Sequence, residues 1–359
     1  MAKKQKKKKR KLKKIPKIFF LIIIIIVLVF LAKKSLDDYE INISNTYDYI
    51  MQKIEEKKNA QDKKNEETKK YNDCLNQEYS SDELSGELQE KEIETTAYLK
   101  KYSVSVKFQD IKTKYTYQYN ENQKYYAAST IKMLDALYIY QEAAKGNLDL
   151  ETTIAYAYKI PNSAGVSKHK IGDKISLRNL VKYAITVSDN TAHQMLVKYI
   201  GYDNLKQYGN SLGATTTLEH TVLGKDNFGD INVTDAIIYV QELYNFINEN
   251  PTLGAELKSY FITSDENYLK DTENNIEAAT KYGEYNTYFH NNGIVYAENP
   301  YFISVLTKLN SNKSIVTNIN KKIQELQNVL YENRKNYCQQ KIYNVQINWL
   351  TIKTRGLKI

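Results

Sequence analysis

The chain has 359 residues, a net charge of +9 at neutral pH and 42% hydrophobic residues. Residues 1–17 hold 11 of the 51 basic residues and no acidic residue, which leaves 40 basic against 42 acidic residues elsewhere. The high net charge therefore belongs to a terminal tail, and neither a nucleic-acid-binding surface nor a nucleic-acid partner is expected in the remainder.

Residues 18–32 form an unbroken apolar run of 15 residues directly after this basic tail. Phe30 and Ala32 would occupy the key positions of a cleavage site, where small residues are needed. We therefore predict an uncleaved signal-anchor in the lipid bilayer at 18–32, with a cleaved signal peptide as the alternative. The positive charge keeps the tail 1–17 in the cytoplasm, so a single-pass membrane protein with an extracytoplasmic domain is expected.

Residues 33–82 are rich in Lys, Glu, Asn and Gln and have few apolar residues, which predicts a polar stalk. A short solvated helix near Met51 is the only element expected there. The two cysteines, Cys74 and Cys338, lie in the stalk and in the predicted C-terminal tail 338–359. They could pair within one chain, pair between chains or stay free. We expect a monomer.

Residues 83–337 alternate between strand-like and helix-like patterns and predict one α+β domain. Its antiparallel sheet comes from both ends of the segment, with a helical region inserted between. Predicted helices cover 83–99, 127 to about 146, 177–185, 191–200, 234–248 and 314–337, and predicted strands cover 104–108, 115–119, 278–285, 293–297 and 301–308.

Ser129 and Lys132 stand three residues apart at the start of the apolar helix 127–146, so they share one helical face. Apolar neighbours desolvate the lysine, which lowers its pKa and makes it a candidate general base. The serine lies where unpaired backbone N–H groups favour a developing anion. Alone this pattern is weak, because an N-capping serine followed by a surface lysine gives the same spacing.

Two further motifs follow in order: Ser188-Asp189-Asn190, and Lys281-Tyr282-Gly283. Ser-x-x-Lys, Ser-Asp-Asn and Lys-Thr-Gly in this order are the signature of class A serine β-lactamases and related penicillin-binding proteins. From about Leu84 to Tyr337 the chain resembles this family, and the residues flanking each motif match as well.

The resemblance implies the following roles. Ser129 attacks the carbonyl, Lys132 takes its proton, and Ser188 passes a proton to the leaving nitrogen. Lys281 supplies positive charge. The substrate would be bound by Asn190, Tyr282, Gly283 and Glu284, the last through a backbone N–H that forms the oxyanion hole with that of Ser129. Asp189 is expected to cap a turn.

The chain departs from the family in two respects. Tyr282 replaces a small hydroxyl residue that helps bind the substrate carboxylate. The Glu-x-x-Leu-Asn loop, whose glutamate activates the deacylating water, is missing between Thr191 and Ala236. Nearby acids there are expected to be solvated loop charges: Glu219, Asp226 and Asp230.

The leading hypothesis is a membrane-anchored serine hydrolase that forms an acyl-enzyme with β-lactams and hydrolyses it slowly. One alternative is a penicillin-binding or D-alanyl-D-alanine peptidase-like enzyme acting on cell-wall peptides. The other is a catalytically degenerate domain that binds peptidoglycan or a partner. No cofactor or metal site is expected, since the histidines lack metal-ligand spacing: His169, His193, His220 and His290.

Overall fold

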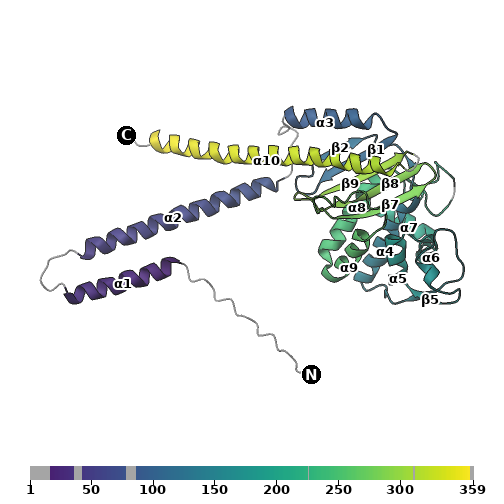
Figure 1. Cartoon of the computed structure of the whole chain (residues 1–359), viewed down its shortest axis with the longest axis horizontal. Coiled ribbons are helices and arrows are strands. Elements are labelled where there is room, and N and C mark those ends of the chain that lie inside the picture. The colour runs from purple at the N-terminus through teal and green to yellow at the C-terminus, as the bar shows by residue number, and fades with distance from the viewer. Residues whose placement is uncertain (1–16, 36–42, 78–85, 225, 310–311, 356–359) are drawn as a thin grey trace, which may run out of the picture. The chain divides into compact units, whose positions relative to one another are not determined.

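The computed structural model describes residues 17–35, 43–77, 86–224, 226–309 and 312–355 (Figure 1). Residues 1–16 of the predicted basic tail, the predicted helix start at Glu83 and residues 356–359 lie outside these ranges. The chain divides into two compact units, Met1–Thr68 and Lys69–Ile359.

The first unit contains helix α1, Lys17–Ser35, and most of helix α2, Ile43–Leu75. The apolar run 18–32 lies in α1, but no helix in the described part of the chain is long and apolar enough to cross a membrane. The transmembrane anchor therefore stays a prediction. The stalk also differs from the prediction, because α2 covers far more of it than the short helix expected. The many Lys, Glu and Gln residues of this segment are good helix formers, which the stalk interpretation overlooked.

The second unit is built on a five-stranded antiparallel sheet in the order β2-β1-β9-β8-β7. Strands from both ends of the domain therefore pair, as predicted, because β1 lies beside β9. The strands are β1 Val104–Asp110, β2 Thr116–Tyr119, β7 Ala278–Tyr285, β8 Tyr288–Val295 and β9 Tyr301–Lys308.

Strand β8 begins at Tyr288, five residues before its predicted start. Its polar segment His290-Asn291-Asn292 resembles a turn in sequence but is fully paired inside the sheet. His290 Nδ1 accepts from Thr307 N, and Asn292 Oδ1 accepts from the Ser304 hydroxyl. Buried polar groups are tolerated where each finds a partner, and a single sequence does not reveal those partners.

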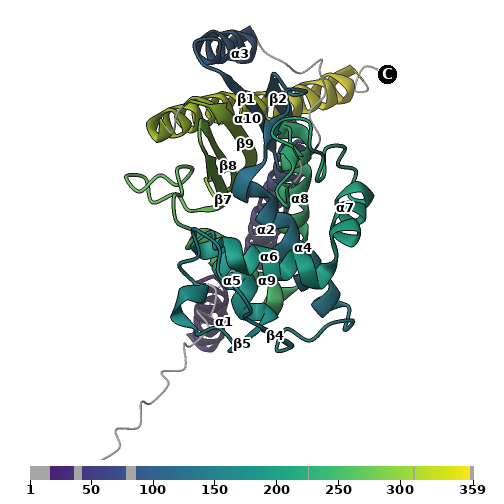
Figure 2. The ribbon, with the colours of Figure 1, turned by 90° about the vertical axis from the view of Figure 1, so that its right-hand side faces the viewer.

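Two apolar cores lie on opposite faces of the sheet. Helices α3, Gly86–Leu99, and α10, Lys313–Arg355, cover one face (Figure 2). The helical region covers the other: α4 Lys132–Ala144, α5 Leu177–Thr186, α6 Asn190–Ile200, α7 Tyr202–Ser211, α8 Val233–Glu249 and α9 Pro251–Ile262. Two short strand pairs complete it: β3 Tyr125–Tyr126 with β6 Asp230–Ile231, and β4 Thr153–Ala155 with β5 Lys174–Ser176. Helices α7 and α9 were not predicted.

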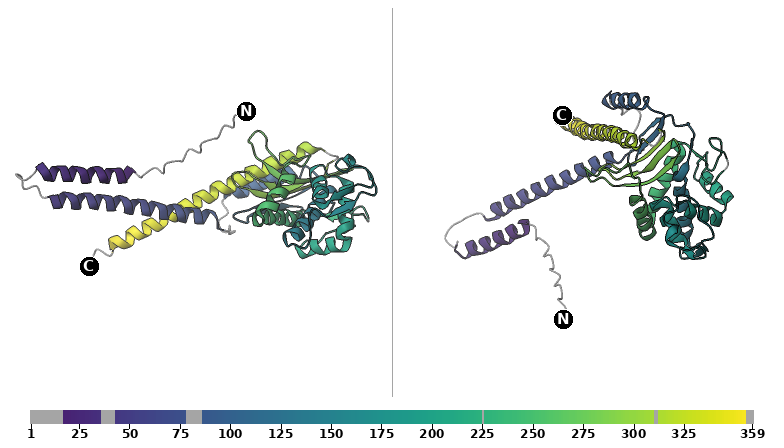
Figure 3. Two further views of the ribbon diagram at one scale, coloured as in Figure 1. Left: turned by 90° about the horizontal axis from the view of Figure 1, so that it is seen from below. Right: turned by 45° about the vertical axis from the view of Figure 1, so that its right-hand side comes forward.

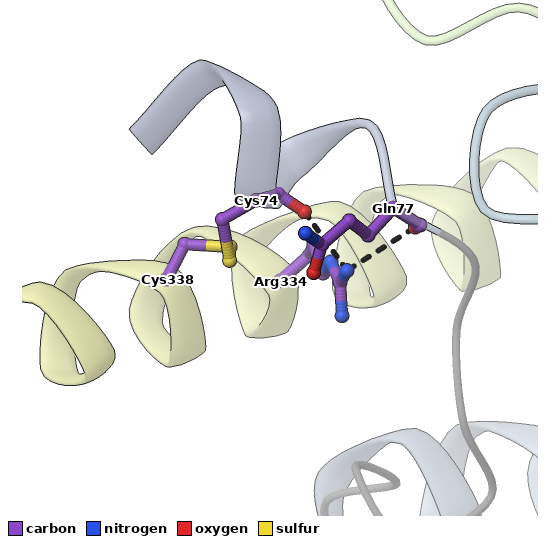
Figure 4. Close-up of a disulfide and its surroundings, with 4 residues drawn as sticks. All are labelled: Cys74, Gln77, Arg334 and Cys338. Carbon is purple, nitrogen blue, oxygen red and sulfur yellow. Dashed lines mark hydrogen bonds between the residues drawn. A yellow bond between two sulfur atoms is a disulfide. The ribbon is translucent and has the colours of Figure 1, made fainter. Parts of the chain in front are cut away.

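Helix α10 continues to Arg355, past the predicted end at Tyr337, so most of the predicted C-terminal tail is helical (Figure 3). Cys338 lies within it and forms a disulfide with Cys74 near the end of α2. This settles the open question of the cysteines in favour of pairing within one chain. One turn away the buried Arg334 guanidinium donates to the carbonyl oxygens of Cys74 and Gln77 at 2.8 and 3.1 Å (Figure 4). The bridge and the arginine together tie residues 74–77 to α10.

Candidate active site

Ser129 lies in a 3₁₀ turn, Ala128–Ile131, that leads directly into α4. The sequence predicted that Ser129 lies in the first turn of an α-helix, whereas the structure has a tighter 3₁₀ turn at this position. Ala128 has a φ of +47°, a conformation that costs energy for a residue with a side chain. Such strain is typical of functional sites.

Lys132 begins α4 and is completely buried. Its Nζ lies 2.8 Å from Ser129 Oγ and 3.2 Å from Ser188 Oγ. The Ser188 carbonyl and Asn190 Oδ1 accept from the same amine, each at 2.7 Å. The lysine therefore bridges the first two motifs and contacts both hydroxyl groups.

Burial lowers the pKa of Lys132 to about 7, against the opposing effect of Asp135 and Asp189. An amine with that pKa is substantially neutral at physiological pH and can accept a proton from Ser129. This is the electrostatic condition that the sequence predicted for a lysine on an apolar helix.

Ser188 and Asp189 form the corner between α5 and α6. Ser188 has a φ of +53°, a second strained residue at the site. The fully buried Asp189 is the N-cap of α6, because its carboxylate accepts from Ala192 N and Val166 N at 2.8 and 2.9 Å. The corner is thus fixed by Asp189, which leaves the Ser188 hydroxyl free to face the two lysines.

Lys281 approaches Ser188 from strand β7, with its Nζ 3.0 Å from Ser188 Oγ. Burial and the nearby Lys132 lower its pKa well below the ordinary value. Gly283 permits this close packing. A Cβ there would stand 2.9 Å from the Ala127 carbonyl oxygen, so any side chain would push β7 away from the nucleophile turn.

The β7 edge also supplies a backbone donor. Tyr296 N donates to Glu277 O directly before β7, and in an antiparallel pair every second residue bonds to the partner strand. Because β7 is the edge strand, the N–H of Glu284 faces away from β8 toward the open edge. It can therefore point at a substrate carbonyl, as can the N–H of Ser129 at the start of its turn. The Glu284 carboxylate itself pairs with Lys313 at 3.2 Å.

The aromatic ring of Tyr282 makes contacts beside the active site that a small hydroxyl residue would not make. The ring centroid lies 4.0 Å from Lys281 Nζ, and the side chain packs against the core under α10. Burial raises the pKa of the Tyr282 hydroxyl, and a hydrogen bond with Ser188 acts in the opposite direction. The third motif thus keeps a hydroxyl near Ser188, but a ring now occupies space beside the lysine.

Asn190 was expected to hold a substrate amide, and in this structure both ends of its side chain have protein partners. Its Oδ1 accepts from Lys132, and its Nδ2 donates to the Pro161 carbonyl at 3.2 Å. A bound substrate would have to share or replace one of these bonds.

The loop 212–232 contains the three acids considered as water-activating bases. Glu219 forms an ion pair with Lys124 at 2.5 Å. Asp226 accepts from the Tyr126 hydroxyl at 2.6 Å and from two loop N–H groups, and the buried Asp230 accepts from Thr221 N at 2.7 Å. The expectation of a solvated charge was wrong for the buried Asp230, and the carboxylates of both Asp226 and Asp230 hold the loop together.

Phe228 is the loop residue that faces the catalytic lysine, and the sequence did not single it out. Its ring centroid lies 5.7 Å from Lys132 Nζ and 4.8 Å from the ring of His193. Asn227 beside it donates to Gln194 of α6. Within the described residues no carboxylate is hydrogen-bonded to Lys132. The contact between Asn227 and Gln194 joins residues 33 positions apart, and no local sequence pattern predicts it.

Known proteins of one family have the fold in which this site lies. The model of the β-lactamase enzyme family matches residues 89–332. The chain belongs to the β-lactamase enzyme family. A β-lactamase from Sphaerobacter thermophilus is 19% identical, with a TM-score of 0.57, and covers 67% of this chain and 97% of its own. The TLA-1 extended-spectrum β-lactamase is 19% identical, with a TM-score of 0.59, over 66% of this chain and 98% of its own.

A point mutant of PBP-A, solved as an acyl-enzyme complex with penicillin G, is 16% identical with a TM-score of 0.57. It covers 67% of this chain and 95% of its own. At these identities the likeness establishes the β-lactamase-like α+β fold. No curated protein matched the chain.

Proposed function

We propose that this member of the β-lactamase family forms an acyl-enzyme on Ser129 with β-lactams and hydrolyses it slowly. The observation that carries the proposal is the position of Lys132. Its buried amine contacts both Ser129 and Ser188, while no described carboxylate is hydrogen-bonded to it. The site thus has the groups that acylation needs, but the deacylation step lacks its usual general base.

In the acylation step, neutral Lys132 accepts the proton of Ser129 as its oxygen attacks the lactam carbonyl. The N–H groups of Ser129 and Glu284 stabilise the oxyanion. The lactam C–N bond breaks, an ester C–O bond forms, and the proton reaches the departing nitrogen through the Ser188 hydroxyl. Lys281 orients that hydroxyl, and its ammonium form would be favoured by a substrate carboxylate.

In the second step, water must attack the ester and lose a proton. General-base assistance is worth about 10²–10⁴-fold in rate, so its loss leaves a long-lived acyl-enzyme. Glu219, Asp226 and Asp230 each have other partners. This supports slow turnover.

The test is incubation of the purified chain with a fluorescent penicillin, followed by a denaturing gel and mass spectrometry. We expect one label on the peptide that contains Ser129, loss of the label in Ser129→Ala, and full labelling in the matched control Ser211→Ala on the exposed face of α7. Labelling followed by cleavage of a D-alanyl-D-alanine peptide would favour the peptidase-like alternative. No labelling by any β-lactam would favour a degenerate binding domain, and Tyr282→Thr then tests the pocket.

We further propose that the domain acts on the extracytoplasmic side of a membrane. The basic tail followed by the 18–32 run supports export, and the Cys74–Cys338 bridge suits an oxidising compartment. A reporter that is active only in the cytoplasm, fused after Ile359, should be silent. Alkaline extraction of membranes separates an anchored chain, which stays in the pellet, from a released one.

A further inference from the structure

A buried carboxylate–imidazole contact lies one helical turn beyond the catalytic lysine. Asp135 of α4 and His193 of α6 are both fully buried, and Asp135 Oδ2 is hydrogen-bonded to His193 Nδ1. The other oxygen, Asp135 Oδ1, has no hydrogen-bond partner among the described residues. Neither residue belongs to the three motifs.

The hydrogen bonds determine how many protons this contact holds. His193 Nε2 lies 3.1 Å from the Asn227 carbonyl oxygen, which can only accept, so Nε2 carries a hydrogen. In neutral imidazole Nδ1 would then be an acceptor. Its contact with a carboxylate oxygen therefore requires one further proton between Asp135 and His193.

The contact is linked to Lys132 by two routes. Along α4, Asp135 follows Lys132 by three residues and its charge acts on that amine. Across the loop, His193 is hydrogen-bonded to the Asn227 carbonyl oxygen, and its ring lies 4.8 Å from that of Phe228, which faces Lys132.

The other charges around Lys132 are accounted for by separate contacts. Asp189 caps α6 through two backbone N–H groups, and Asp226 binds Tyr126 and its own loop. Lys281 on β7 binds Ser188. Among these groups, Asp135 is the carboxylate that is hydrogen-bonded to an imidazole.

We propose that Asp135 and His193 form a proton-sharing pair that positions residues 226–229 against Lys132 and sets the charge facing its amine. They are positioning residues rather than catalytic residues, because neither contacts the reacting atoms. The proposal rests on the proposed acylation of Ser129. It adds that the neighbouring buried pair Asp135–His193 sets the pH range in which Ser129 is acylated.

The experiment measures the acylation rate with fluorescent penicillin against pH for the full chain, Asp135→Asn and His193→Gln. Acylation needs neutral Lys132. Asp135→Asn removes the carboxylate that raises the pKa of Lys132 and keeps a donor to Nδ1, so the acidic limb of the rate profile should move to lower pH. His193→Gln keeps a donor to Asn227 but leaves Asp135 uncompensated, so the limb should move up. Asp203→Asn on the exposed surface of α7 and His169→Gln, whose ring contacts Tyr183 instead, are the matched controls.

A second measurement separates this proposal from the proposed function. The 13Cε chemical shift of Lys132, assigned with Lys132→Arg, reports its titration without any substrate. Opposite shifts of that titration in the two variants support the pair even if no β-lactam acylates Ser129. Unchanged or equal titrations in the folded variants overturn the pair even if acylation is normal. If His193→Gln does not fold, Asp135→Asn is the deciding variant. An acidic limb of its acylation rate profile that stays at the same pH or moves to higher pH contradicts the proposal.

Discussion

The two sides of the active site differ in which of the groups needed for acyl transfer they contain. The acylation side consists of Ser129, Lys132, Ser188 and Lys281, which come from three segments and are linked by hydrogen bonds from the two lysines to the two serines. The loop side, residues 212–232, places the Phe228 ring toward Lys132, and two of its acids, Asp226 and Asp230, bind N–H groups of the loop itself. The contrast teaches that one protein can keep the groups for forming an ester while lacking those for hydrolysing it.

The largest effect is expected from replacing Lys132, the general base of the acylation side. Lys132→Gln keeps a polar side chain but no group that takes the serine proton, so acylation should fall by about 10²–10⁴-fold. Stopped-flow labelling with fluorescent penicillin measures the rate. Lys168→Gln, which changes an exposed lysine of the 3₁₀ turn Val166–Lys168, is the control and should acylate normally. A loss below tenfold would mean that another group activates Ser129.

The loop side should gain function from an added carboxylate. Phe228→Glu places an acid near Lys132 in the segment that Asp226 already holds, so deacylation should quicken by roughly 10²-fold, the lower end of general-base assistance. Single-turnover decay of the acyl-enzyme measures this, with Phe228→Gln as the uncharged control. Equal decay in both variants would show that the missing carboxylate does not limit turnover.

The pH dependence follows from the lowered pKa of Lys132, which burial brings to about 7. The neutral amine is the active form, so the acylation rate should rise through pH 7 and fall roughly tenfold for each unit below it. Labelling rates between pH 5 and pH 9 check this. A rate that is flat across that range would mean that Lys132 does not act as the base.

The smallest effect on the chemistry is expected far from either side. Replacing both Cys74 and Cys338 by Ser should lower the free energy of unfolding by about 2–4 kcal/mol, because the bridge restricts the unfolded chain. Urea unfolding measures this. The acylation rate should stay unchanged, and a slower rate would show that residues 74–77 influence the site.

Much of the fold could be predicted from local patterns. The strand patterns at 104–108 and 301–308 predicted strands from both ends of the domain, which pair as β1 and β9, and the predicted helix 177–185 is confirmed as α5. The start of β8 could not be predicted, since His290 and Asn292 are satisfied only by residues on the neighbouring strand.

The motifs identified which residues meet at the site, because Ser-x-x-Lys, Ser-Asp-Asn and Lys-Tyr-Gly stand in a recognisable order. They did not identify Phe228 or the Asp135–His193 pair. Those positions depend on how the loop crosses α6, which is set by Gln194 and Asn227 across 33 residues of chain. A single sequence contains no signal for that distance.

The most direct test of the central account follows the acyl-enzyme through time by intact mass spectrometry after a short pulse of penicillin. We expect stoichiometric addition of one penicillin mass to the wild-type chain, none to Ser129→Ala, and an adduct that persists long after free penicillin is removed. Adduct that disappears as fast as it forms, with multiple rounds of penicillin hydrolysis, would contradict the account and show that the loop side holds a working base.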